Sequence, residues 1–331
     1  MAYTTIDDPS AYFKAQLYTG NGSTQSITFD DTDTDMEPDF VMLKGRDVVA
    51  GLNVHDSVRG VNKQIYTNTS DAEETLTTTL TAFNSDGFSL GSNGNANSDT
   101  KLFVAWCWKE TADAGFDIVS YTGNATARTI SHNLSAVPHW MVVKNRGSDV
   151  NWTVYHHKNT SAPETDRLLL NTDAATGDSD AEWNDTAPTS SVFSVGTGDS
   201  PNKDGDAIIA YLWSGKQGFS KFGSYTGNNN ADGAFEFTGF RPAFVLIKNA
   251  TDGADWTIND IARDPHNVNN LRLFLNDNKV EDSGSNSMDM LSNGFKLRST
   301  DSGNNAAQTY IYMAFAESPF VNSNGVPCNA R

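Results

Sequence analysis

The chain has 331 residues, with 41 acidic against 23 basic side chains and a formal net charge of −18. This charge argues against nucleic acid and anionic membrane surfaces as partners. Hydrophobic residues form 37% of the chain, which is enough for packed cores. The longest unbroken apolar runs, such as Leu102 to Trp108, are far shorter than the about 18 residues of a membrane-spanning helix. The first residues lack a basic and an apolar region, so we expect no signal peptide.

Five landmarks follow one another in the first third of the chain. They are Tyr18-Thr19-Gly20-Asn21, an apolar strand from Pro38 to Lys44, the segment Leu52 to Val54, a short apolar segment from Gly87 to Leu90, and the aromatic strand Leu102 to Trp108. The apolar segments are rich in Val, Phe and Trp and are bounded by Gly, Pro, Asn and Asp, which is typical of β-strands. Segments with helical periodicity are scarce.

The same landmarks return twice in the same order, about 100 residues apart, which is the size of a small domain. The second set is Tyr121 to Asn124, Pro138 to Lys144, Asn151 to Val154, Val192 to Val195 and Ala207 to Trp213. The third set is Tyr225 to Asn228, Pro242 to Lys248, Asp255 to Ile258, Gly294 to Leu297 and Tyr310 to Ala316. The chain therefore contains three copies of one unit.

We predict an all-β protein of three tandem homologous antiparallel β-sandwich, jelly-roll-like domains. The predicted division is an N-terminal arm at 1–14, repeat 1 at 15–110, repeat 2 at 111–215, repeat 3 at 216–318 and a C-terminal arm at 319–331. The joins between repeats are short and contain aromatic residues, so we expect neighbouring repeats to pack together.

Motifs for catalysis or metal binding are weak. The G-x-S-x-G pattern around Ser89 lies in strand-like sequence, and the repeats place Ser194 and Lys296 at the same position, so it does not indicate a nucleophile elbow. An EF-hand starting at Asp31 fails, because Met36 and Met42 stand where glycine and glutamate are needed. An irregular Ca²⁺ site in the acidic loops is the alternative to plain solvation. We predict no catalytic residue, no metal ligand, no cofactor and no enzymatic activity.

Repeated residues are the candidates for binding or for an interface. A lysine ends the same strand in each repeat, where a charge most simply caps the strand or protects a sheet edge. Aromatic residues alternate along the last strand of each repeat; one set should face the core, and the other could face a neighbouring domain or a sugar ring. The candidates are Lys44, Lys144, Lys248, Trp152, Trp256, Trp108 and Trp213.

The sequence resembles a family of tail and virion proteins from marine bacteriophages, such as cyanophages, often labelled tail fibre or tail protein. The resemblance runs from YTGNGSTQSIT and PDFVMLKGRD through GFSKFGSYTGN to IYMAFAESPF and covers nearly the whole chain. It implies a structural component of the virion, assembled in the host cytoplasm, and it implies no catalytic residues.

The function expected from this resemblance is non-enzymatic: a tail appendage that takes part in host adsorption. Expected partners are other virion proteins, further copies of the chain, with a trimer favoured, and a glycan or receptor on the host surface. One alternative is a capsid decoration or head-fibre protein. Others are a glycan-cleaving tail spike and a secreted carbohydrate-binding module, the last disfavoured by the missing signal peptide.

Overall fold

A computed structural model describes residues 4–29 and 34–319. Most of the predicted C-terminal arm, from residue 320 onward, lies outside these ranges, as do residues 1–3 of the N-terminal arm. Part of the acidic run, at 30–33, and Cys328 also lie outside them.

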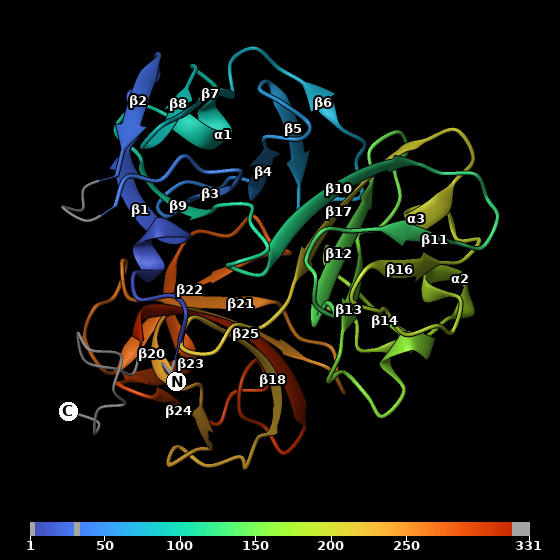
Figure 1. Ribbon diagram of the computed structural model, residues 1–331. Coiled ribbons are helices and arrows are strands. Elements are labelled where there is room, and N and C mark those ends of the chain that lie inside the picture. The colour runs from blue at the N-terminus through green and yellow to red at the C-terminus, as the bar shows by residue number, and fades with distance from the viewer. Residues whose placement is uncertain (1–3, 30–33, 320–331) are drawn as a thin grey trace.

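Each sequence repeat contributes a similar succession of short strands (Figure 1). The predicted N-terminal arm contains η1 (Pro9–Ala11) and the first two residues of β1 (Phe13–Thr19), which continues into repeat 1. Repeat 1 also contains β2 (Gln25–Thr28), β3 (Phe40–Gly45), β4 (Asn53–Asp56), β5 (Lys63–Tyr66), β6 (Glu74–Thr75), β7 (Leu80–Asn84), β8 (Gly87–Leu90), α1 (Gly94–Asn97) and β9 (Leu102–Trp108). Repeat 2 contains β10 (Phe116–Thr122), β11 (Arg128–Ser131), β12 (Trp140–Asn145), β13 (Thr153–His156), η2 (Pro163–Thr165), β14 (Asp166–Leu169), β15 (Gly177–Asp178), α2 (Asp180–Trp183), β16 (Val192–Val195), α3 (Asp199–Asn202) and β17 (Ala207–Trp213). Repeat 3 contains β18 (Ser220–Thr226), β19 (Phe235–Phe237), β20 (Phe240–Asn249), β21 (Thr257–Asp260), β22 (Asn269–Phe274), β23 (Asp282–Leu291), β24 (Gly294–Leu297) and β25 (Thr309–Pro319).

The strands form antiparallel sheets, which confirms the predicted all-β fold. The large sheet of repeat 1 has the order β1-β9-β3-β4-β5-β6, and that of repeat 2 has the equivalent order β10-β17-β12-β13-β14-β15. In repeat 3 the order begins in the same way, β18-β25-β20-β21-β22, and continues through β23 and β24 to β19. Small sheets, β2-β8-β7 and β11-β16, accompany the first two large sheets. In each repeat the last strand therefore lies between the first strand and the lysine-ended strand.

The central strands of each large sheet bury both faces, because successive side chains point to opposite sides. In β3, Val41 and Leu43 pack with residues of the small sheet, such as Phe88. Phe40 and Met42 point the other way, into a cluster that also contains side chains of repeats 2 and 3. The near-continuous apolar sequence of these strands follows from this double burial.

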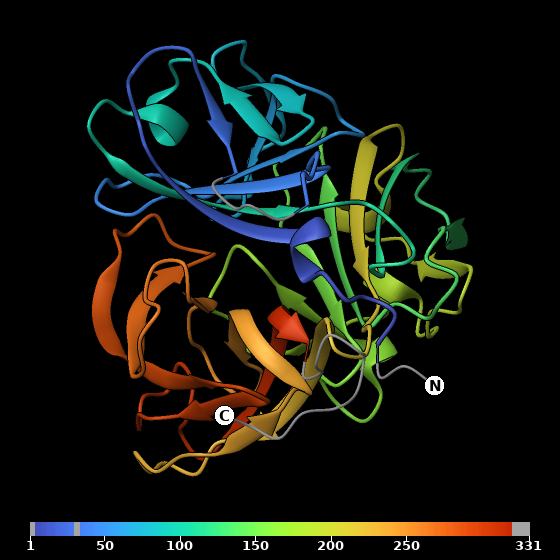
Figure 2. The same ribbon diagram turned by 60° about the vertical axis from the view of Figure 1, so that its left-hand side comes forward.

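The three large sheets are arranged around a common centre (Figures 1 and 2). Aromatic side chains of all three repeats belong to the hydrophobic core between these sheets. Equivalent positions of the three repeats meet there, and all of these side chains are buried: Phe40, Trp140 and Phe244; Trp108, Trp213 and Phe315; Trp106, Tyr211 and Met313. Ring pairs such as Phe40 with Tyr211 and Trp108 with Phe315 join different repeats at centroid distances of 4.6 and 5.4 Å. Non-directional burial of aromatic surface thus holds the repeats together.

The repeated Tyr-Thr-Gly-Asn motif forms one loop three times. In repeat 2, the Tyr121 hydroxyl donates to the Pro201 carbonyl at 2.7 Å, and buried Asn202 accepts from the Asn124 amide at 3.0 Å. Asn97 and Asn305 hold the loops of repeats 1 and 3 in the same way. The glycine is required because a Cβ at Gly123 would lie 2.0 Å from the Lys203 carbonyl oxygen. This motif therefore fixes backbone geometry.

This close approach makes Gly123→Ala a test of the loop. The added methyl group would clash with backbone, so we expect the free energy of unfolding to fall by about 1–3 kcal/mol in urea denaturation. Gly177→Ala is the matched control, because nothing lies within 4 Å of its Cβ position, and a change below about 0.5 kcal/mol is expected there. Equal losses in both variants would contradict this role of the loop.

Candidate functional site

The strand-ending lysines lie at the junctions between repeats. The Lys144 Nζ donates to the carbonyl of Val150 in its own repeat and to that of Ser70 in repeat 1, both at 2.7 Å. Lys44 bridges Ala50 and Asp277 of repeat 3, and Lys248 bridges Ala254 and Asp173 of repeat 2, at 2.6–2.7 Å. Repeat 1 thus reaches repeat 3, repeat 2 reaches repeat 1, and repeat 3 reaches repeat 2. The three junctions close a ring within one chain.

These lysines do not protect a sheet edge. Each lies on a strand with a partner on both sides, and each residue is 0% exposed. Burial lowers the pKa of all three to about 8, although nearby carboxylates such as Asp277 and Asp149 act in the opposite direction. The ammonium groups are still mostly protonated at pH 7 and therefore donate to the carbonyls they bridge.

The predicted tryptophans also lie at junctions or in the centre. The Trp152 indole N–H donates to the Tyr66 carbonyl of repeat 1 at 3.0 Å, and the Trp256 indole N–H donates to the Leu169 carbonyl of repeat 2 at 3.1 Å. Repeat 1 has Leu52 at this position; at its junction with repeat 3 the Thr67 hydroxyl donates to the Leu275 carbonyl instead. Trp108 and Trp213 are buried in the aromatic centre, so neither is a ligand platform.

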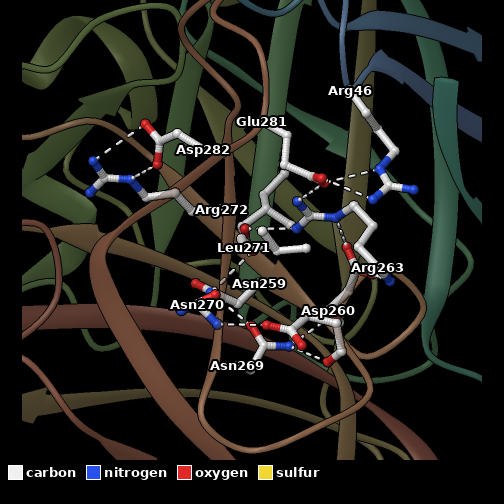
Figure 3. A network of polar contacts seen from close by, with 12 residues as sticks. Arg46, Asn259, Asp260, Arg263, Asn269, Asn270, Leu271, Arg272, Glu281 and Asp282 are labelled. Carbon is white, nitrogen blue, oxygen red and sulfur yellow. Dashed lines mark hydrogen bonds and ion pairs between the residues drawn. The ribbon is translucent and has the colours of Figure 1, made fainter. Parts of the chain in front are cut away.

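A charged network reinforces the junction between repeats 1 and 3 (Figure 3). Glu281 of repeat 3 accepts two hydrogen bonds from Arg46 of repeat 1, at 2.8 and 3.0 Å, and one from Arg263 at 3.0 Å. Arg263 also pairs with Asp260 at 2.5 Å, and the Asp260 carboxylate accepts from the Trp106 indole of repeat 1 at 3.1 Å. Bidentate charge-assisted bonds of this kind fix orientation as well as contact.

The junction between repeats 2 and 1 repeats this network. Glu73 of repeat 1 accepts two hydrogen bonds from Arg146 of repeat 2, both at 2.9 Å, and one from Arg59 at 3.2 Å. Arg59 pairs with Asp56, whose carboxylate accepts from the Tyr211 hydroxyl at 2.7 Å. Burial acts to raise the pKa of Glu73, but hydrogen bonds and charges from the two arginines outweigh it and lower the pKa.

The junction between repeats 3 and 2 has uncharged residues at the corresponding positions. Ala250 stands in place of Arg46, and Thr176 in place of Glu281; their backbones bond at 3.0 Å. Asn159 replaces the second arginine and accepts from the Thr176 hydroxyl at 2.8 Å. His156 replaces Asp260 and contacts the Tyr312 carbonyl of repeat 3 at 3.4 Å. Sequence reasoning missed this set, although aligning the repeats would have placed the residues in register.

Three histidines gather at this uncharged junction. The rings of His139 and His157 stack with centroids 4.1 Å apart, and His157 Nε2 contacts the Phe222 carbonyl of repeat 3 at 3.0 Å. The Nδ1 atoms of His139 and His156 accept backbone N–H groups, from Gly215 at 2.9 Å and Lys158 at 3.0 Å. These acceptor roles require neutral rings. Burial lowers the pKa of His139 to about 4 and that of His156 well below 6.5; the neighbouring imidazoles and Lys158 act in the same direction.

The protein has one hollow in the aromatic centre and another beside the junction of repeats 3 and 2. A cavity of about 40 Å³ in the aromatic centre is lined by apolar side chains of all three repeats, including Trp108, Trp213 and Met313. An open polar cleft of about 480 Å³ lies on repeat 3 beside Asp173 of repeat 2. Four of its charged groups form two ion pairs: Arg272 with Asp282 at 2.6 Å, and Lys279 with Asp255 at 3.9 Å.

The motifs set aside in the sequence have structural partners. Ser89 lies within β8, where its Oγ is 3.0 Å from Ser26 Oγ, and no strand-to-helix turn presents it. Asp206 belongs to one of the acidic loops considered for an irregular Ca²⁺ site; its carboxylate accepts hydrogen bonds from the Ser148 hydroxyl at 2.6 Å and the Asn145 side-chain amide at 3.0 Å. Within residues 4–29 and 34–319, no three His, Cys, Asp or Glu side chains are grouped to hold a metal ion. The same ranges contain no helix of the length and apolarity needed to span a membrane.

Comparison with known proteins gives a family without an assigned activity. A family model described as a domain of unknown function (DUF7483) matches residues 8–319. The chain therefore belongs to this family. No curated protein matches the sequence.

Lys144→Met tests the lysine bridges. The thioether keeps most of the side-chain volume but donates no hydrogen bond, so the carbonyls of Ser70 and Val150 lose their partner. We expect the free energy of unfolding to fall by about 1–3 kcal/mol. Exposed Lys158→Met is the control, with an expected change below about 0.5 kcal/mol. A neutral or stabilising Lys144→Met would show that relief of charge burial dominates.

The histidine junction predicts that stability falls as the pH is lowered from about 6.5 towards 4. In this window the unfolded chain binds protons near the usual histidine pKa of 6.5, whereas the folded chain does not. His156→Gln should reduce the slope by up to about 1.4 kcal/mol per pH unit. Urea denaturation at several pH values measures the slope, and exposed His266→Gln should leave it unchanged. A slope unaffected by His156→Gln would exclude this contribution.

Proposed function

We propose that this member of the DUF7483 family is a non-enzymatic structural protein of a bacteriophage particle, most specifically a tail appendage that takes part in host adsorption. The resemblance of the sequence to virion proteins of marine phages supports the location. The structure supports the mode of action, which is display of surface loops on a rigid body.

One observation carries this proposal: the repeated residues at the junctions and beneath the loops are buried, whereas the exposed loop residues that follow the shared asparagine differ between repeats. The lysines at the junctions and the asparagines that hold the loops are 0% exposed in every repeat. The exposed parts of the same loops read Asn21-Gly22-Ser23, Asn124-Ala125-Thr126 and Asn228-Asn229-Asn230. A fixed scaffold with divergent loops is the arrangement that binding proteins use to change their targets.

The closed ring of three repeats within one chain limits which surfaces further copies of the chain can use to associate. Each junction uses a heterologous surface, and three such junctions already close on themselves. The homotrimer that we expect for a tail appendage would therefore form through the outer surfaces of the repeats. Contacts with other virion proteins would use the same outer surfaces or the terminal arms.

Immunogold labelling of purified particles with an antibody to this chain tests the proposed location. We expect gold at the tail, and preincubation of host cells with the purified chain should then slow adsorption. Gold over the head would instead identify a capsid decoration or head-fibre protein and remove the adsorption role. Intact particles without the chain, established by mass spectrometry, would contradict the proposal altogether.

A further inference from the structure

The third repeat carries two exposed aromatic side chains that the ring does not use. Phe235 and Phe237 are 43% and 50% exposed, although most large apolar side chains of the described chain are buried. They lie on β19, which ends the sheet order next to β24. Being two residues apart on a strand, they point to the same, outer face.

The equivalent strands of the other repeats have the opposite polarity. The cross-strand pairs Ser26–Ser89, Thr129–Ser194 and Phe235–Lys296 place the three strands in register. On the outer face, repeat 1 therefore has Ser26 and Thr28, and repeat 2 has Thr129 and Ser131, all exposed. The inward residue is Ile27 in repeat 1, Ile130 in repeat 2 and Glu236 in repeat 3.

This inversion works against stability at both positions. Exposing two phenylalanine rings forgoes the free energy of burying them. Placing the Glu236 carboxylate where its counterparts are buried isoleucines removes it partly from water, and this burial raises its pKa, although Lys221 partly opposes the rise. The same chain folds the sister strands with the ordinary pattern. A surface that deviates from it in both positions is therefore a candidate for binding.

Polar groups of both signs surround the two rings. Lys296 lies directly opposite Phe235 in the neighbouring strand and pairs with Asp232 at 2.8 Å. The Lys221 ammonium lies 5.7 Å from the centroid of the Phe237 ring. Flat apolar faces with hydrogen-bond donors and acceptors at their rim match a sugar, whose C–H face packs on a ring while its hydroxyl groups both donate and accept.

The size and edge of this surface disfavour a protein partner. Two rings with these exposed fractions offer roughly 140–230 Å² of apolar area, well below the about 800 Å² per partner of a stable protein interface. Addition of a peptide strand is also hindered, because Lys221 Nζ already donates to the Phe237 carbonyl on this edge strand. The area suits a few sugar rings.

We propose that the outer face of β19 and β24, formed by Phe235, Phe237 and Lys296 with Lys221 at its border, binds a saccharide chain. This inference deepens the proposed function, because it makes a glycan of the host surface the adsorption target. It assigns the contact to one repeat and leaves the corresponding faces of the other two without it.

The test uses the purified full chain on a printed array of bacterial surface polysaccharides. Wild-type protein should bind at least one polysaccharide, and the double variant Phe235→Ser/Phe237→Thr should bind it at least tenfold more weakly. These substitutions install the residues of repeat 1, so folding should be retained and is checked by thermal unfolding. The matched control, Ser26→Ala/Thr28→Ala on the equivalent strand, should bind like wild type. Lys296→Ser should weaken binding by a smaller factor.

Three outcomes would overturn the inference: no wild-type binding to any polysaccharide on the array, equal binding by the double variant, or loss of self-association by the double variant in analytical ultracentrifugation. The last outcome would identify the face as a contact between copies. Gold labelling separates this inference from the proposed function. Labelled particles without glycan binding would refute only the saccharide site, whereas glycan binding by a chain absent from particles would refute only the virion role.

Discussion

The arrangement of the three repeats depends on a buried ammonium group at each junction. Aromatic packing supplies the attraction between repeats, but it is non-directional and would permit several ways of docking. Lys44, Lys144 and Lys248 each need acceptors once they are removed from water, and each finds one in its own repeat and one in the next. A neighbour that docked in a different register would leave a charge without partners. Each lysine therefore favours one orientation of the neighbouring repeat. Because the same contact forms at all three junctions, the repeats close into a ring.

The charged networks reinforce this orientation at two of the three junctions. At two junctions a glutamate between two arginines continues inward to an aspartate and an aromatic donor of the next repeat. At the third junction the positions hold alanine, threonine, asparagine and histidine, which bond without formal charge. The third junction contains imidazoles whose pKa is lowered by burial, so its contribution to stability decreases as the pH falls below about 6.5. A ring of homologous repeats thus has one junction with a distinct electrostatic character.

The sequence predicts the strands and their repetition well, because both are local signals. The double-sided burial of β3, β12 and β20 is visible as an apolar run, and its lysine is visible as the end of that run. The role of each lysine at a junction is not a local signal, because the acceptor in the neighbouring repeat lies 233, 74 or 75 residues away. Edge protection and burial at a junction look identical until the neighbouring repeat is in place. The same limit applies to Trp152 and Trp256, whose indole acceptors belong to another repeat.

Because the chain contains three copies of one unit, the unusual residue pattern of β19 can be interpreted by comparison with the other two repeats, without any related sequence. Repeats 1 and 2 show what the fold requires on the outer small-sheet strand: a polar residue, a buried isoleucine and a polar residue. Because the backbone register of β19 is the same, the exchange to Phe235, Glu236 and Phe237 cannot be a requirement of the fold. Nor is it an uncompensated drift at one position, since the outward and inward residues have both changed polarity. The scaffold tolerates the exchange because the junctions and the aromatic centre lie on the opposite face of the large sheets. Because the junction contacts and the outer face of each repeat are separate, one repeat can acquire a contact surface while the contacts that form the ring are kept.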